Sequence, residues 1–184
     1  MIAAGGLSSR FVETIYALLP AWLTRGEEPL EIRVAEIADT ESIVAVINAA
    51  FRPAEGFVFD RERIDSDSVR DLMHKGTFLV VEGQGKLCGC VYVELRGERS
   101  YLGLLSVDPQ RQKSGLGAKL MGAAEAYCAK AGSRHMDLRI VSLRTEMYGF
   151  YQRRGYAETG AEPLTAGLNP KLPCHFVKMS KPLA

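Results

Sequence analysis

Hydrophobic and polar residues change their pattern several times along the chain, and each change predicts a secondary-structure element. Residues 101–107 (YLGLLSV) are apolar at nearly every position, which is typical of a strand buried on both faces. Residues 116–130 are rich in Ala and Leu, and their apolar side chains recur at helical spacing. Residues 108–115 lie between them, so a buried strand leads through a glycine-containing loop into a helix.

The rest of the chain alternates between shorter strand and helix patterns. Strands are predicted at residues 31–37, 77–82, 86–95 and 135–141, after Gly155, and near residues 175–180. Helices are predicted from Asp39 or Thr40 to about Ala50, and over residues 65–75 with Gly76 at the helix end, while residues 52–59 are expected to form a loop. Turns at residues 83–85 and 96–98 join three of the strands in a meander, so we expect a mixed sheet flanked by helices.

The composition is that of an ordinary globular domain. The 184 residues are 47% hydrophobic and 24% charged, and the formal net charge of +1 gives no support for a nucleic-acid partner. We expect one domain over residues 31–184, preceded by an extension, a helix plus a linker, over residues 1–30. None of the four cysteines forms a Cys-x-x-Cys pair, which favours buried thiols, a reducing cytoplasm and no metal site.

Within the extension, residues 11–23 form an apolar stretch. The stretch contains Glu13 and Pro20 and is too short to span a bilayer, so we expect neither a signal peptide nor a membrane anchor. A helix packed on the domain or on a second subunit, and hence a homodimer, is compatible with the pattern. A start codon assigned too far upstream is the alternative.

The segment 107–120 (VDPQRQKSGLGAKL) has the features of an anion-binding site. The first turn of a helix presents unpaired amides and a partial positive charge. Gly115 and Gly117 let an anion approach the backbone, Lys113 adds a cation, and Ser114 is a candidate N-cap. The alternative is a turn whose amides bind water. A dinucleotide fingerprint is excluded because its third glycine is missing, and a P-loop because no Gly-Lys-Ser/Thr closes the segment.

Two motifs together resemble a known family. Residues 112–117, Gln-x-x-Gly-x-Gly, follow an apolar strand as the acetyl-CoA loop does in the GCN5-related N-acetyltransferase (GNAT) family. Residues 147–156 (MYGFYQRRGY) resemble that family's short helix ending in Tyr-x-x-x-Gly-Phe, with Tyr156 in place of the Phe. The motifs occur in the family's order. The resemblance covers the chain from Glu31 onward and implies the GNAT fold: α/β (α+β), with a mixed, mostly antiparallel central sheet of six to seven strands.

The resemblance also implies acetyl-CoA as cosubstrate. In the family it lies where the strand before the loop separates from the strand after the long helix, here residues 101–107 and 135–141. Backbone groups of Leu105, Ser106 and Val107 would then bind the pantetheine and the acetyl carbonyl. The loop residues would hold the pyrophosphate: Gln112, Lys113, Ser114, Gly115, Leu116, Gly117 and Ala118.

For catalysis, the resemblance assigns to Tyr151 the protonation of the departing thiolate, a role that suits a phenol protonated at neutral pH. Tyr148, one turn earlier, is the alternative donor. The identity of the general base is left open by the sequence. Family members often carry a Glu or His where this chain has Tyr101, which is a poor base but can orient a relay water. Glu94 and Glu98 are the other candidates, although each is more typical of a solvated surface carboxylate.

One departure from the family concerns Arg144, which stands where an Asn is common and would reach either a CoA phosphate or an acidic group of the acceptor. Acceptor specificity is expected from residues 51–70, the C-terminal hairpin and the turn around Gly97. Residues 52–71 hold six acidic and four basic side chains, an excess compatible with a cationic amine.

We therefore expect a cytoplasmic, acetyl-CoA-dependent N-acetyltransferase that acts by direct attack on a primary amine of a small molecule. A peptide or protein amine is the alternative acceptor. A GNAT fold that binds CoA without catalysis is the alternative of a different class. Neither a nucleic acid nor a membrane is an expected partner.

Overall fold

The structure is a computed structural model that describes residues 30–165 and 167–183. The predicted extension over residues 1–30 therefore lies almost wholly outside the described residues. No helix in the described ranges is long and apolar enough to cross a membrane.

Strands and helices follow one another much as the sequence pattern predicts. The strands are β1 (Glu31–Val34), β2 (Thr77–Gly83), β3 (Lys86–Arg96), β4 (Arg99–Val107), β5 (His135–Val141), β6 (Ala157–Glu162) and β7 (Phe176–Pro182). The helices are α2 (Thr40–Glu55), α3 (Ser66–Lys75), α4 (Leu116–Lys130) and α5 (Thr145–Gln152), with short 3-10 turns η1 (Ile37–Asp39) and η2 (Pro109–Arg111).

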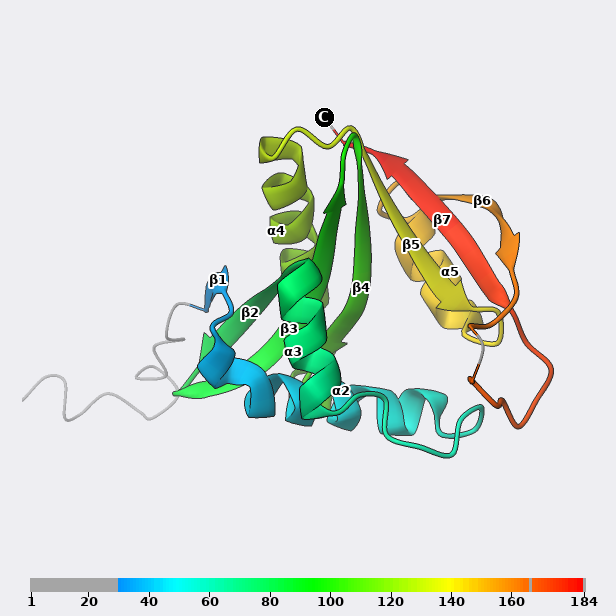
Figure 1. Ribbon diagram of the computed structural model, residues 1–184, viewed down its shortest axis with the longest axis horizontal. Helices are drawn as coiled ribbons and strands as arrows, with labels where there is room; N and C mark the ends of the chain where they lie inside the picture. The colour runs from blue at the N-terminus through cyan, green and yellow to red at the C-terminus, as the bar shows by residue number, and fades with distance from the viewer. Residues whose placement is uncertain (1–29, 166, 184) are drawn as a thin grey trace, which may run out of the picture. The chain divides into compact units, whose positions relative to one another are not determined.

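The strands form one sheet in the order β1-β2-β3-β4-β5-β7-β6 (Figure 1). Every neighbouring pair is antiparallel except β4 and β5, which run parallel. The expected mixed, mostly antiparallel sheet of six to seven strands is confirmed. The parallel pair matters for function because it is joined only over a short stretch at one end.

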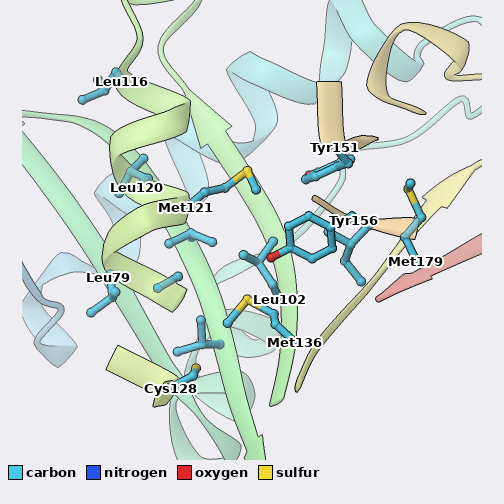
Figure 2. Packing of buried hydrophobic residues seen from close by; sticks show 14 of the residues in the cluster. Leu79, Leu102, Leu116, Leu120, Met121, Cys128, Met136, Tyr151, Tyr156 and Met179 are labelled. Carbon is cyan, nitrogen blue, oxygen red and sulfur yellow. The ribbon is translucent and has the colours of Figure 1, made fainter. Parts of the chain in front are cut away.

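Helices cover both faces of the sheet, and the alternation of side chains along β3 shows why. Cys90 and Tyr92 point into the cluster under α2 and α3, whereas Val91 and Val93 point into the cluster under α4 and α5. Figure 2 shows the second cluster, in which α4 contributes Leu120 and its neighbours. Burial on both faces explains the long apolar run in the sequence of this strand.

The predicted bounds of α4 are confirmed, but those of α2 and of the first strand are not. β1 ends at Val34 rather than at residue 37, because the chain turns into η1 there. The sequence predicts a helix to about Ala50 followed by a loop, whereas α2 continues to Glu55 with Pro53 inside its last turn. A proline removes one backbone donor, which is tolerated where the helix is about to end. Burial of Ala50 and Glu55 and an ion pair of Glu55 accompany the extra turn. Because α2 extends to Glu55, the Glu55 side chain is held by the last turn of a helix and by its ion pair.

Candidate active site

A cleft of about 1190 Å³ opens where β4 and β5 separate. The two strands pair only over residues 99–101 and 135–137, and Figure 1 shows them together at one end and apart at the other. The cleft is lined by the end of α2, the middle of β4, the glycine loop, β5 and α5. Its volume exceeds that of a typical small-ligand pocket, so it can hold a large cosubstrate together with an acceptor.

The β4 wall of the cleft contains a bulge. Cys90 faces Ser106 and Tyr92 faces Gly103, so two residues of β4 stand opposite one residue of β3. Leu104, inside the bulge, has a positive φ of 51°. The Ser106 hydroxyl donates a hydrogen bond of 3.0 Å to the Leu104 carbonyl. The bulge leaves backbone groups of residues 104 and 105 without β3 partners, available to a ligand in the cleft.

The glycine loop forms the next wall. Lys113 and Gly115 have positive φ angles of 64° and 85°, and α4 begins immediately afterwards at Leu116. The amides of Leu116 and Gly117 make no hydrogen bond with the described residues and lie at the positive end of the helix dipole, whereas the Ala118 amide donates to the Gly115 carbonyl at 3.0 Å. A Cβ added to Gly117 would meet only Val107 at 3.8 Å and Phe150 at 4.0 Å, ordinary contact distances. The protein itself therefore has room for a side chain at residue 117, and the open space adjoins the cleft.

This wall suits a diphosphate. Lys113 lines it, and Arg111, Arg153 and Arg154 add guanidinium groups to the same cleft. Backbone amides, a helix N-terminus and nearby cations are together the usual means by which proteins bind phosphate. The residues present thus fit the pyrophosphate of coenzyme A.

Most of the predicted cosubstrate-binding residues line the cleft, but three side chains do not. Ser106 is buried and bonded to β4, as described above. Leu116 is 2% exposed and packs in the core below α4. Ser114 donates its hydroxyl to the Arg111 carbonyl at 2.7 Å, and the N-cap of α4 is Gly115. The prediction that Ser114 caps the helix is wrong, because its hydroxyl is used in the preceding turn. For these three residues only the backbone remains for a ligand.

Tyr151 of α5 lines the cleft and is held in place by aromatic packing. Its ring makes edge contacts with Phe150 and Tyr156, with centroids 5.2 and 5.7 Å apart. Figure 2 shows the side chains of Tyr151 and Tyr156. Its hydroxyl makes no hydrogen bond within the described ranges, yet it is not among the fully buried unpartnered atoms. The hydroxyl is therefore open to the cleft. Burial raises the pKa of Tyr151 well above its ordinary value, so the phenol keeps its proton at neutral pH.

The alternative donor Tyr148 has a different environment. Its hydroxyl donates a hydrogen bond of 2.9 Å to Glu158 at the start of β6, and its side chain is absent from the residues that line the cleft. The geometry therefore favours Tyr151 over Tyr148.

Tyr101 lies on β4 in the acceptor part of the cleft, defined here as the part lined by the end of α2, the 61–63 segment, Tyr101 and Arg139. Its ring lies between two guanidinium groups, 4.7 Å from Arg96 and 5.8 Å from Arg139. These contacts fix the ring over Gly103, in a position from which its hydroxyl can orient a water molecule.

The two glutamates considered as bases lie outside the cleft lining. Glu94 is bound by Arg96 at 2.9 Å, and this hydrogen bond lowers the pKa of Glu94. Glu98 is largely exposed and lies 3.6 Å from Arg134. Neither is positioned to take a proton from an acceptor in the cleft.

The structure instead brings Glu55 into the acceptor part, which the sequence did not indicate. Its side chain is 10% exposed and lines the cleft. Glu55 Oε1 accepts a hydrogen bond of 3.2 Å from Arg144 Nη1, and Oε2 lies 4.0 Å from Arg63 Nε. Burial raises the pKa of Glu55, although Arg63 and Arg144 oppose the rise. No motif marks this residue, because its surroundings come from segments far apart in sequence.

Arg144 also binds Glu146, so two carboxylates hold its guanidinium group. Its side chain is only 13% exposed and lines the cleft. Arg144 is thus a link between the end of α2 and the start of α5. No cluster of three or more potential metal ligands occurs within the described ranges.

Comparisons with known proteins agree with this geometry. Residues 47–182 match the model of a family described as acetyltransferase (GNAT) domain. A mycothiol acetyltransferase from Clavibacter sepedonicus is 26% identical over 84 residues, which are 46% of this chain and 28% of that protein. The match thus spans less than a third of that relative.

Two solved structures share the fold. The ribosomal-protein-S18-alanine N-acetyltransferase from Escherichia coli superposes with a TM-score of 0.67 at 15% identity, covering 84% of this chain and 94% of that one. The PaiA N-acetyltransferase from Thermoplasma acidophilum, in complex with coenzyme A, gives 0.68 at 18% identity, covering 83% and 98%. With the family match over most of the chain, the conclusion is direct: this protein belongs to the GNAT family of acetyltransferases, which use acetyl-CoA as the acetyl donor.

Proposed function

We propose that the protein is an N-acetyltransferase that transfers the acetyl group from acetyl-CoA to a primary amine of a small molecule by direct attack. The observation that supports this most is the Tyr151 hydroxyl, which is open to the same cleft as the β4 bulge and the glycine loop. A thioester carbonyl, an attacking amine and a proton donor can therefore meet in one space.

In this proposal the β4 bulge and the glycine loop hold the cosubstrate. Backbone groups of Leu105, Ser106 and Val107 bind the pantetheine and orient the acetyl carbonyl, and an N–H aimed at the carbonyl oxygen stabilises the charge that develops there. Backbone amides of residues 112–118 bind the pyrophosphate. We assign Arg144 to holding Glu55 rather than to a CoA phosphate, because two carboxylates already bind its guanidinium group.

Two proton transfers accompany the attack on the carbonyl. An alkylammonium group must lose a proton before its nitrogen attacks, and Glu55 accepts that proton, directly or through a water oriented by Tyr101. The C–N bond then forms and the C–S bond breaks, while the thiolate takes the Tyr151 proton. The second nitrogen proton restores Tyr151, and Glu55 releases its proton to solvent.

Replacing Tyr151 by Phe tests the proposal. We expect kcat to fall at least 100-fold, in the range usual for loss of a general acid. The melting temperature should change little, because the ring packing is kept and the hydroxyl has no hydrogen bond to lose within the described ranges. The measurement is CoA thiol release over a panel of polyamines, aminoglycosides, arylalkylamines, amino acids and short peptides.

Tyr148→Phe is the matched control, since it removes a hydroxyl from the same helix outside the cleft lining. Its kcat should equal that of the unmodified protein. Equal kcat for Tyr151→Phe would refute the role of Tyr151. If no amine is turned over while acetyl-CoA still raises the melting temperature, the protein is a CoA-binding module rather than an enzyme for these acceptors.

A further inference from the structure

A second cavity of about 300 Å³ adjoins the acceptor part of the cleft. Five residues line both spaces: Phe51, Glu55, Arg61, Arg63 and Leu168. Because the two cavities share these walls, a ligand in the cleft can extend into the smaller one. We call the smaller cavity the side subsite. Its volume is at the lower end of that of small-molecule sites, so it suits one compact chemical group.

The charges of the side subsite are not balanced. Arg52 is paired with Glu62, and Asp60 lies 3.3 Å from Lys171. Arg61 forms no ion pair with a residue of the described ranges. Arg63 has only Glu55, at 4.0 Å. The guanidinium groups of Arg61 and Arg63 thus line the shared space. The one carboxylate near Arg63, that of Glu55, is also bound by Arg144.

Arg63 is also incompletely satisfied. Its guanidinium lies over the ring of Phe51, 5.1 Å from the centroid, which fixes its orientation. Its Nε is the one buried side-chain polar atom without a hydrogen-bond partner among the described residues. A buried donor without a partner is costly, and an anionic group is the strongest acceptor for a guanidinium. Arg61 is exposed, so solvent can satisfy its guanidinium group. The Arg63 side chain is 33% exposed, but its Nε is buried from solvent.

The remaining lining of the side subsite is apolar. Phe51, Phe59 and Leu168 provide it, from α2, the segment that follows α2 and the segment that precedes β7. A ligand group here meets aromatic and aliphatic surface on one side and guanidinium groups on the other. An amino acid with an apolar or aromatic side chain presents this combination.

We propose that the acceptor is an amine that also carries a carboxylate, as a free amino acid does. The carboxylate binds to Arg63 and Arg61, the side chain enters the side subsite, and the amine points toward Glu55. This inference rests on the proposed function and adds the acceptor class. It also revises the expectation, drawn from the acidic excess of residues 52–71, that this region suits a purely cationic amine. Of the charged side chains in that segment, those that line the cleft are one glutamate and two arginines.

The test compares amino acids with the amines that lack only the carboxylate. The pairs are phenylalanine and phenethylamine, leucine and 3-methylbutylamine, tryptophan and tryptamine, and histidine and histamine. We expect at least one amino acid to exceed its partner tenfold or more in kcat/KM for CoA release. The phosphonate analogue of that amino acid separates carboxylate recognition from a general preference for anions, and it should be turned over more slowly.

Arg63→Gln should remove the preference by lowering kcat/KM at least tenfold more for the amino acid than for the partner amine. The partner amine should lose some activity as well, because Arg63 also acts on the Glu55 carboxylate. Arg63→Lys should restore part of it, because the charge is kept and the planar fork is lost. Arg70→Gln is the matched control: Arg70 is paired with Asp67 and Glu41 outside both cavities, and its loss should leave the preference unchanged.

The inference is overturned if every decarboxylated amine is used as well as its amino acid, or if Arg63→Gln lowers both members of a pair alike; the N-acetyltransferase proposal survives either result. If no amine of any class is turned over, the proposed function fails instead. In that case, calorimetry with CoA and the N-acetyl amino acids decides: binding that Arg63→Gln abolishes supports the carboxylate site, and no binding overturns it.

Discussion

The two parts of the cleft are built in opposite ways. The part assigned to the cosubstrate comes from one continuous stretch, residues 104–118, in which a bulged strand, a glycine loop and a helix N-terminus follow one another. The acceptor part is assembled from the end of α2, the 61–63 segment, Tyr101 and Arg139. Its Glu55 is held by Arg144, 89 residues away in sequence. A continuous site is specified by local sequence, whereas an assembled site depends on tertiary packing.

Among changes that separate the two parts of the cleft, the largest effect should follow from changing Glu55. Glu55→Gln keeps the shape of the side chain but removes the proton acceptor, so we expect kcat to fall about 100-fold, the lower end of the range for a general base. The KM for acetyl-CoA should stay the same, because residue 55 lies outside residues 104–118. Steady-state kinetics with each substrate varied in turn measures both quantities.

The pH profile distinguishes this role from a structural one. The groups that face Glu55 are Arg63, Arg144 and Glu146, together with Cys174 in the segment before β7. Burial raises the pKa of Glu55, so kcat/KM should rise with pH over a range above that of an ordinary glutamate, as the carboxyl group loses its proton. Glu55→Gln should lack this rise.

An acceptor analogue whose amine pKa lies below the assay pH is already neutral and needs no base. Glu55→Gln should therefore impair its acetylation far less than that of an ordinary alkylamine. Equal losses for both acceptors would mean that Glu55 only maintains structure. Glu41→Gln, an exposed change at the other end of α2, is the control and should leave kinetics unchanged.

The next largest effect is expected in the part assigned to the cosubstrate. Gly117→Ala places a methyl group where the protein has room for it, so stability should not fall, but the methyl group would stand in the proposed pyrophosphate position. We expect the KM for acetyl-CoA to rise about tenfold with kcat at saturation nearly unchanged, since the lost interaction contributes mainly to binding. Initial rates with acetyl-CoA varied at a saturating acceptor concentration measure this.

Gly122→Ala is the matched control, because Gly122 lies on the same helix and an added Cβ there would meet nothing within 4 Å. It should leave the KM unchanged and stabilise the protein by about 0.5–1 kcal/mol, the usual gain for Gly to Ala within a helix. If both variants raise the KM equally, the loop does not hold the cosubstrate in the way proposed.

The same contrast explains what the sequence predicts and what it does not. Helix α4 is predicted to the residue because its apolar spacing and its flanking glycines are local. The sheet follows from apolar strands and short turns, although β1 ends at Val34 rather than at residue 37. The extent of α2 is misjudged because burial outweighs the local preference of Pro53. Glu55 and Arg63 escape prediction because each is an ordinary charged residue in sequence. Only packing shows that one is desolvated and that the other has a buried donor without a partner.

The smallest effect should come from Lys113, which is exposed at the edge of the continuous part. A solvated charge contributes little and is screened by salt, so Lys113→Gln should raise the KM for acetyl-CoA about threefold at low ionic strength, corresponding to about 0.7 kcal/mol. The difference should nearly disappear at about 0.5 M salt. Acetyl-CoA titrations at the two salt concentrations measure it.

Lys119→Gln is the control for Lys113, since Lys119 is exposed on α4 but is not part of the cleft lining. A loss at Lys113 that persists in high salt would mean that its left-handed backbone, with φ of 64°, shapes the loop more than its charge attracts phosphate. In that case Lys113→Gly, which favours the same backbone without the charge, should bind acetyl-CoA better than Lys113→Gln. The loop would then bind anions through its backbone shape, with the lysine charge secondary.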